Sequence, residues 1–320
     1  MTRALVLSSG LGAAGYQIGA LRHLLHDRHL HFDVCAGSGL GAINAAFVAC
    51  GEFDALLHFW QGIGWRKFIG FNWHTPWREG PFTTAPLKRF LVQHISESKL
   101  AQAKTQLKFT CLNLQTGCEE WVTFPGSPLP LIDVLGTAFG VPGLTAPLRV
   151  HHQQWTDASY INSFMLRQIV REGAADEVWA IAASATETVF AQAPRRPYSH
   201  WRAVAARGLQ LNQAHDVWRG LREANQLSAA AAAHQHVRAQ LPDRVAGSIA
   251  DPVLREQLRE QLRERLTRVF DQSSFPMKSH ALIIHALTPS KLISASTWRF
   301  RRDEILAAQQ LGYRDAGALA

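Results

Sequence analysis

Apolar residues in the first part of the chain fall into short continuous runs that are separated by longer helical patterns. The runs RALVLSS (3–9), FDVCAGS (32–38) and DEVWAIAAS (176–184) have the length and content of buried strands. Between them, residues 16–25 and 41–51 carry apolar side chains at helical spacing. Strands that alternate with helices predict an α/β fold, with helices covering both faces of a central, mostly parallel sheet.

The rest of the chain contains two further regions, each with a different pattern of apolar and polar residues. LKFTCLNL (107–114) and EEWVTF (119–124), separated by QTGC, are typical of a hairpin-like pair of strands. From about residue 201 to 270 the pattern is helical and polar, and a final strand, HALIIHAL (280–287), precedes the helical segment 301–316. We therefore expect residues 1–195 to form the α/β core. Residues 196–320 are expected to form a mostly helical extension with a final strand, packed on the same domain.

One helix in the extension is well defined by its own residues. In DPVLREQLREQLRERLTRVF, Asp251 is placed to cap the helix and Pro252 stands in its first turn. Four leucines share one side of this helix, and Arg and Glu occupy the other: Leu254, Leu258, Leu262 and Leu266. The stripe predicts a helix packed on the body of the protein, with a lid or partner-binding role as the alternative.

Composition and charge narrow the range of partners and compartments. The net charge of +8 over 320 residues favours an anionic partner such as a phospholipid surface, although an ordinary Arg-rich surface has the same composition. No signature of specific nucleic-acid binding accompanies the charge. The four cysteines lack metal-site or disulfide spacing, so we expect free thiols, a cytoplasmic protein and no metal. No apolar run reaches the roughly 18 residues of a membrane span, and residues 1–15 are interpreted as a strand and turn rather than a signal peptide.

Two glycine-rich turns are the candidate sites. Gly37, Gly39 and Gly41 follow a strand and precede a helix, as in the G-x-S-x-G elbow of serine hydrolases, but the central position is Gly39. Gly10, Gly12 and Gly15 fit the G-x-G-x-x-G of a dinucleotide-binding turn. That fold requires an acidic residue at the end of the second strand, where this chain has Ala36, Gly37 and Ser38. A dinucleotide-binding oxidoreductase is therefore the weaker alternative, and we expect no cofactor.

Several segments resemble the patatin-like phospholipase family in both order and spacing. They are RALVLSS…YQIGALRHL, FDVCAGSGLGAINAAF, VPGLTAPLRV…WTDASYINS, GAADEVWAIAAS and the closing LTPSKLISASTWRFRRDEILAAQQLGYRDA. The resemblance implies a three-layer sandwich and lipid acyl hydrolysis. In that family an elbow serine attacks the ester, an aspartate is its base, and a glycine-rich loop holds the oxyanion with backbone amides.

Carried over position by position, the resemblance keeps the base and loses the nucleophile. The aspartate corresponds to Asp157, and the serine position is Gly39. The oxyanion loop corresponds to Gly10, Leu11 and Gly12, and its basic residue is absent in either alignment. The sequence thus predicts a pseudoenzyme that binds a lipid, an acyl chain or a protein partner. An active hydrolase or acyltransferase that uses Ser38 with Asp157 is the alternative.

Aromatic residues gather in one segment, HFWQGIGWRKFIGFNWHTPWREGPF (58–82), among Arg66, Lys67 and Arg78. This mixture is typical of a loop that rests in a membrane interface, and equally of core packing. Peripheral contact with an anionic membrane is the corresponding hypothesis.

Overall fold

The computed structural model describes residues 1–62, 64–150, 152–184, 189–190, 200–272, 282–291, 293 and 301–319. Its centre is an eight-stranded sheet with the order β10-β9-β1-β2-β5-β8-β7, and β6 pairs with β5 beside this path. The sheet strands are β1 (Arg3–Leu7), β2 (Val34–Gly37), β5 (Gln106–Asn113), β6 (Glu119–Phe124), β7 (Leu148–Val150), β8 (Gln153–Asp157), β9 (Glu177–Ile181) and β10 (Ile283–Leu287). The five strands from β10 to β5 run parallel, whereas β6, β7 and β8 are antiparallel to their neighbours.

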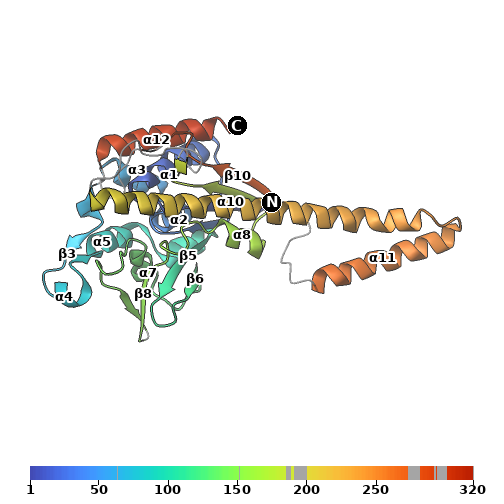
Figure 1. Cartoon of the computed structure of the whole chain (residues 1–320), viewed down its shortest axis with the longest axis horizontal. Coiled ribbons are helices and arrows are strands. Elements are labelled where there is room, and N and C mark those ends of the chain that lie inside the picture. Colours follow the sequence, from blue (N-terminus) through green and yellow to red (C-terminus); the bar gives the residue numbers. More distant parts are fainter. Residues whose placement is uncertain are drawn as a thin grey trace.

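Helices cover both faces of this sheet (Figure 1). In the first half they are α1 (Gly15–Arg22), α2 (Leu40–Ala49), α3 (Phe53–Gln61), α4 (Pro76–Glu79), α5 (Ala85–His94), α6 (Glu97–Ala103) and α7 (Leu131–Thr137), with short turns η1 (Leu11–Ala14), η2 (His23–Asp27) and η3 (Trp65–Lys67). In the second half they are α8 (Leu166–Glu172), α10 (Trp201–Ala246), α11 (Pro252–Gln272) and α12 (Arg302–Gly317). A small ribbon of β3 (Gly70–Phe71) and β4 (Phe82–Thr83) stands apart.

Strand β1 shows how the sequence creates two buried layers. Leu5 and Leu7 join the apolar cluster that contains the side chains of α1, α2 and α3. Ala4 and Val6, which alternate with them, join a second cluster with α8 and Val217 of α10. Because successive side chains of a strand point to opposite faces, a continuous apolar run is the pattern of a strand buried on both sides. The predicted α/β sandwich is confirmed.

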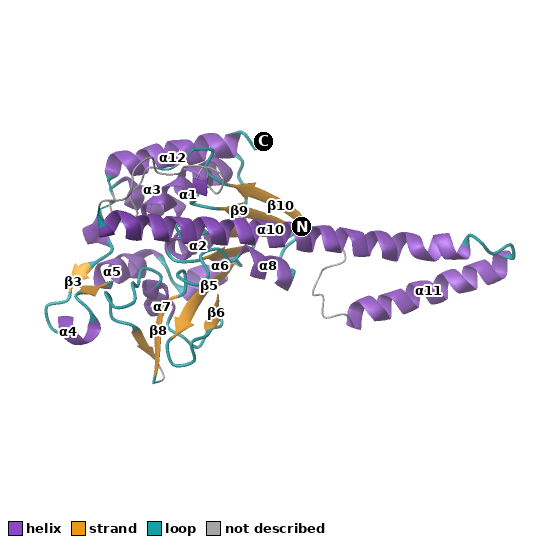
Figure 2. Cartoon of the chain, in the orientation of Figure 1, coloured by secondary structure: helices purple, strands orange, loops and turns teal. Residues whose placement is uncertain are grey.

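The predicted strand at 280–287 is β10, which pairs in parallel with β9 and so belongs to the same sheet as the first strand (Figure 2). The helix after it, α12, packs on α1. Residues 294–300, part of the closing segment that resembles the family, lie outside the described residues. Residues 191–199 do too, so the division into 1–195 and 196–320 stays a prediction.

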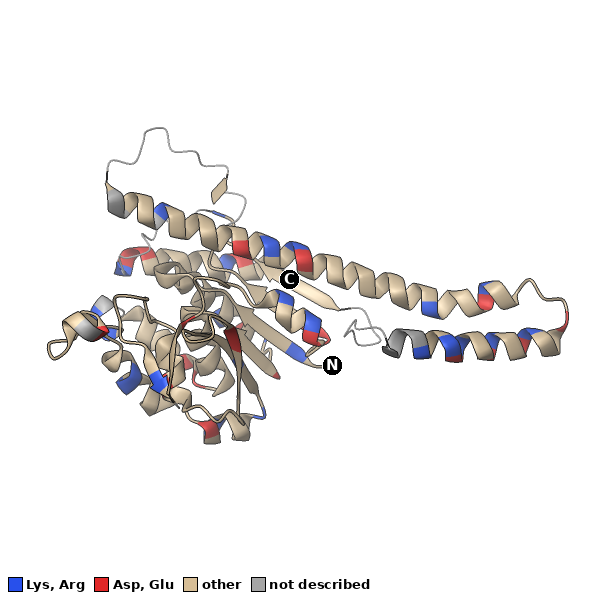
Figure 3. Cartoon of the chain, turned by 60° about the horizontal axis from the view of Figure 1, so that its bottom comes forward, with Lys and Arg blue, Asp and Glu red and all other residues tan. Residues whose placement is uncertain are grey.

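The helix that begins after Asp251 does not pack as predicted. Its cap is confirmed, because the Asp251 carboxylate accepts a hydrogen bond from the Val253 amide at 2.9 Å. However, α11 packs against α10, and the two project as an arm beyond the part of α10 that packs on α8 and the body (Figure 1). Arg259 on α11 pairs with Asp243 on α10 at 2.7 Å. Acidic and basic residues alternate along the rest of α11 (Figure 3). The helix thus lies beside another helix instead of the body, and Leu254 at the start of its stripe is exposed.

Candidate functional site

The elbow at the end of β2 has a sharply turned backbone with a glycine at its centre. Gly39 has φ 54° and ψ −133° and caps the N-terminus of α2. A positive φ of this kind is strained for a residue with a side chain and unstrained for glycine. A Cβ on Gly37 would collide with the backbone of Gly41, and one on Gly41 would collide with the Ser8 carbonyl oxygen. The two flanking glycines are thus required by the close approach of strand and helix.

Two serine hydroxyls occupy the space beside Gly39. A Cβ built on Gly39 would lie 2.5 Å from the Ser9 Oγ and 3.2 Å from the Ser159 Oγ. Ser9 comes from the end of β1 and Ser159 from the turn after β8, so three distant segments of the chain meet here. Within the part of the chain that the structure describes, the Ser9 hydroxyl has no hydrogen-bond partner.

Asp157 lies at the end of β8 and is held by the residue two positions later. One carboxylate oxygen accepts the Ser159 amide at 2.9 Å, and the other accepts the Ser159 hydroxyl at 2.5 Å. The Ala158 carbonyl accepts hydrogen bonds from the amides of Ile161 and Asn162, which closes the turn. Because Ser159 also lies beside the Cβ position of Gly39, the structure brings Asp157 to the elbow.

Burial sets the ionisation of this carboxyl group. Asp157 is buried, and the loss of solvation raises its pKa from 3.8 to about 7, although the two hydrogen bonds from Ser159 oppose the rise. The titratable side chains that interact with it are Cys111 and Tyr160, and burial raises the pKa of each to about 12. Near neutral pH both are uncharged, so Asp157 is the group at the site that changes charge there.

Ser38 lies at the elbow with its side chain in the core. It is 1 % exposed, and its hydroxyl has no hydrogen-bond partner within the described residues. Its amide donates to the Leu7 carbonyl at 3.2 Å, which ties it to β1. A hydroxyl sealed in this way has neither a base nor access to substrate.

The loop after β1 leads into the short turn η1, whose first backbone amides are free to donate within the described backbone. Leu11 has φ 43°, a left-handed conformation that is costly for a leucine. A Cβ on Gly10 would collide with the Ala183 side chain, which explains a glycine there. Leu11 and Gly12 open the 3₁₀ turn η1, and their amides donate to no backbone acceptor among the described residues. The loop therefore still offers donors, without the basic residue of the family pattern.

A buried chain of side-chain hydrogen bonds fixes the loop relative to the elbow helix. The Trp60 indole donates to Asn44 on α2 at 3.0 Å, and Asn44 donates to Gln17 on α1 at 2.9 Å. Gln17 then donates to the Ser8 carbonyl at 2.7 Å. Since each buried polar group is satisfied, this chain holds α1, α2 and the end of β1 in one arrangement.

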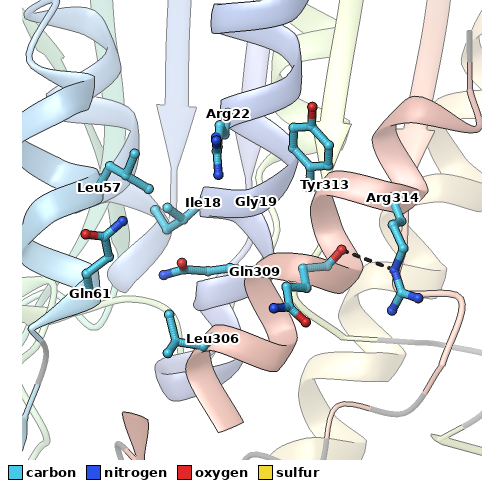
Figure 4. A pocket seen from close by; sticks show the side chains of 10 residues that line it. Ile18, Gly19, Arg22, Leu57, Gln61, Leu306, Gln309, Tyr313 and Arg314 are labelled. Atoms are coloured by element: carbon cyan, nitrogen blue, oxygen red, sulfur yellow. Dashed lines mark hydrogen bonds between the residues drawn. The ribbon is translucent and has the colours of Figure 1, made fainter. Parts of the chain in front are cut away.

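A cavity lies away from the elbow, between α1, α3 and α12. It has a volume of about 470 Å³ and is lined by Ile18, Gly19, Arg22, Leu57, Gln61, Leu306, Gln309, Gln310, Tyr313 and Arg314 (Figure 4). Tyr313 donates to Asp27 at 2.6 Å, and the Arg22 guanidinium lies over its ring. None of the predicted site residues lines this cavity.

The aromatic segment is divided between core and surface. Trp60 and Phe68 are buried, whereas Phe71, Trp73 and Trp77 are exposed, with Trp77 at 98 %. The side chain of Trp65 lies outside what the structure describes. No described helix combines the length and the hydropathy needed to cross a membrane.

Sequence reasoning named Asp157 and Gly39, which the structure brings near each other through Ser159, and it did not name Ser159 as part of the site. The available signal was a hydroxyl in place of the second small residue after the aspartate. Its significance depends on which way the side chain points, and that is visible only in the structure.

A comparison with known protein families identifies a domain that contains these segments. The family model described as patatin-like phospholipase matches residues 5–170, slightly more than half of the chain, and this range contains the loop, the elbow and Asp157. The search of curated proteins found no significant match.

Proposed function

Because the chain belongs to the patatin-like phospholipase family, we propose that it binds the acyl ester of a lipid at the elbow, and that residue 39 has lost its part in hydrolysis. The observation that carries the proposal is Gly39 itself. The elbow conformation, the flanking glycines and Asp157 are retained, yet no side chain is present where the family has its nucleophile. An acyl-enzyme at residue 39 is therefore impossible, while the surroundings that receive an ester remain.

The amides near the elbow support ester binding. The first N–H groups of a helix have no acceptor within it, and this applies to Leu40 at the start of α2 and to Leu11 and Gly12 at the start of η1. Such amides suit the carbonyl oxygen of an ester, which carries partial negative charge. The buried Gln17–Asn44 hydrogen bond keeps the two sets of amides in a fixed arrangement.

The Ser38 alternative has less support, because its hydroxyl is buried and makes no hydrogen bond within the described residues, whereas Asp157 accepts the Ser159 hydroxyl.

Contact with a membrane surface has more support than the Ser38 alternative. Phe71, Trp73 and Trp77 are exposed on the β3–α4 segment, and Arg66 and Lys67 nearby are exposed as well. Exposed indoles next to cations are suited to the headgroup region of an anionic bilayer, so we include peripheral membrane contact in the proposal.

A photoreactive ether phospholipid tests the binding site, because an ether linkage resists hydrolysis and crosslinks can be mapped by mass spectrometry. We expect crosslinked peptides from residues 8–12, 37–41 and 157–161. The α1–α12 cavity provides the internal comparison, since it is of a size to take up a small apolar group. Crosslinks confined to that cavity, or their complete absence, would overturn the proposal.

A further inference from the structure

The residue beside Gly39 that has both a hydroxyl and a base is Ser159. Its Oγ donates to Asp157 at 2.5 Å and lies 3.2 Å from the Cβ position of Gly39. From this geometry we infer that Ser159 is the nucleophile of this site, and that it accepts the acyl group of the bound ester with Asp157 as its base. The inference rests on the proposed binding of an acyl ester and goes beyond it, since it assigns covalent chemistry to a residue outside the elbow.

The position of the hydroxyl is favourable for attack. A Cβ at residue 39 would lie 3.2 Å from the Ser159 Oγ, so this hydroxyl stands beside the position from which a serine side chain at residue 39 would extend. Leu40, whose amide has no backbone acceptor within the described chain, is the next residue. We therefore expect an ester carbonyl that accepts a hydrogen bond from this amide to be within reach of the Ser159 Oγ.

Ser159 lies in a turn that continues onto the surface. Ser159 itself is buried, with 9 % of its surface exposed, and the next two residues, Tyr160 and Ile161, are exposed. Ser38 is only 1 % exposed, so Ser159 is the more accessible of the two serines.

The other nearby serine, Ser9, has no base beside it. The Ser9 Oγ is nearer to the Cβ position of Gly39, at 2.5 Å, but it makes no hydrogen bond to a carboxylate. A serine hydroxyl is a weak nucleophile until a base takes its proton. Ser9 is for this reason the matched comparison for Ser159, because it has the same chemistry and neighbourhood without the base.

The reaction balances with the groups present. The Ser159 oxygen forms a bond to the ester carbonyl carbon while its proton passes to Asp157, and the ester C–O bond then breaks as that proton moves to the departing alcohol. Water next attacks the acyl-serine, gives one proton to Asp157 and releases the carboxylic acid, and the proton returns to the Ser159 oxygen. Burial favours this use of Asp157, because a pKa of about 7 lets the carboxyl accept and return a proton near neutral pH.

Labelling with a fluorophosphonate probe, followed by peptide mapping, tests the assignment in the full-length protein. We expect the label on Ser159 and its loss in Ser159→Ala and Asp157→Asn. Ser9→Ala and Ser38→Ala should leave the label on the same Ser159 peptide, and Ser248→Ala, an exposed serine just after α10, should not change its rate. Thermal unfolding of each variant identifies any that fails to fold. Ser159→Cys supplies a further readout, since it should shift labelling toward a thiol-directed probe without requiring full esterase activity.

The two proposals fail in different ways. Crosslinking by the ether phospholipid at residues 37–41 and 157–161 without any fluorophosphonate label would overturn Ser159 as the nucleophile and leave ester binding intact. Label on Ser159 without crosslinking there would support the nucleophile and overturn lipid binding. Label that survives Ser159→Ala and disappears in Ser9→Ala or Ser38→Ala would also overturn the inference.

Discussion

At the scale of single residues, Gly39 leaves room for the hydroxyls of Ser9 and Ser159, which lie where a side chain at residue 39 would begin. A side chain at residue 39 would enter the volume in which these two oxygens lie. A serine restored at residue 39 must therefore displace at least one of them, in addition to tolerating φ 54°. The position of a side chain at residue 39 and the two hydroxyls thus share one volume.

This reasoning predicts that Gly39→Ser alone is unfavourable. We expect it to lower the free energy of unfolding by about 1–3 kcal/mol, through backbone strain and contact with Ser9. Combining it with Ser9→Gly should recover part of the loss, since the collision is with that side chain. Chemical denaturation of the two single variants and the double variant forms a thermodynamic cycle. Strictly additive effects would show that the two positions do not compete for space.

A second prediction concerns Asp157 and pH. Its carboxyl group has a pKa of 3.8 when it is fully solvated, as in the unfolded chain, and about 7 in the folded protein. Between these two pH values the folded state therefore holds a proton that the unfolded state has released. The free energy of unfolding should therefore fall as pH rises through this range, by up to about 1.4 kcal/mol per pH unit, and level off above it.

The variant Asp157→Asn removes this titration and keeps an oxygen that can accept the Ser159 amide. Its stability relative to the unmodified protein should increase as the pH is raised through about 7. Urea unfolding at acidic and at mildly alkaline pH measures the difference. A stability difference that is the same at both pH values would mean that the carboxyl titrates normally in the folded protein.

The same group predicts the pH dependence of labelling. Ser159 needs the ionised carboxylate, so the rate of fluorophosphonate labelling should rise through about pH 7 and reach a plateau above it. Rates measured across this range, corrected for hydrolysis of the probe, give the apparent pKa. A flat profile would indicate that Asp157 does not act as the base.

At the scale of elements, the strands β1, β2, β5, β6, β9 and β10 could be predicted, whereas β7 and β8, the strand that ends in Asp157, could not. The packing partners of some elements could not be predicted either. The apolar runs at 3–9 and 32–38 identify buried strands because burial on both faces leaves no other pattern. The leucine stripe of α11 indicates that something covers it, but a stripe does not say whether the cover is the body or a neighbouring helix. The location of Ser159 beside Gly39 was likewise inaccessible, since it depends on a contact between residues 120 positions apart in the chain.

The contact between α1 and α12 gives a prediction at this scale. A Cβ on Gly312 would collide with the Tyr16 carbonyl oxygen, whereas Gly208 on α10 has no atom within 4 Å of its Cβ position. Gly312→Ala should therefore destabilise the fold by about 1–3 kcal/mol and loosen α12, as seen in faster hydrogen exchange of its amides. Gly208→Ala should be neutral or stabilising by up to about 1 kcal/mol, because alanine favours a helix. Equal effects of the two changes would contradict the close packing of α12.

At the scale of the whole molecule, a net charge of +8 and an exposed aromatic segment occur in a protein whose site accommodates a lipid ester in our proposal. Phe71, Trp73 and Trp77 belong to the β3–α4 segment at one end of the body, far along the molecule from the projecting tip of the α10–α11 arm (Figure 1). Among the described residues, the first of these regions carries exposed indoles, whereas the exposed apolar residues near the arm tip, such as Leu241, Val253 and Leu254, are aliphatic. It is thus the surface that we expect to contact a bilayer.

Sedimentation with lipid vesicles tests this surface. The protein should bind vesicles that contain anionic lipid and be released as salt is raised, because screening weakens the attraction of surface charges. Replacing Trp73 and Trp77 together by Ala should weaken partitioning by roughly tenfold or more, since inserting one large apolar side chain contributes about 1.5–3 kcal/mol. Trp218→Ala is the matched control, because Trp218 is an exposed tryptophan on α10, outside the β3–α4 segment. Equal binding to neutral and anionic vesicles would remove the electrostatic contribution. A loss of binding in Trp218→Ala that equals the loss in the Trp73 and Trp77 variant would show that the β3–α4 segment has no special role.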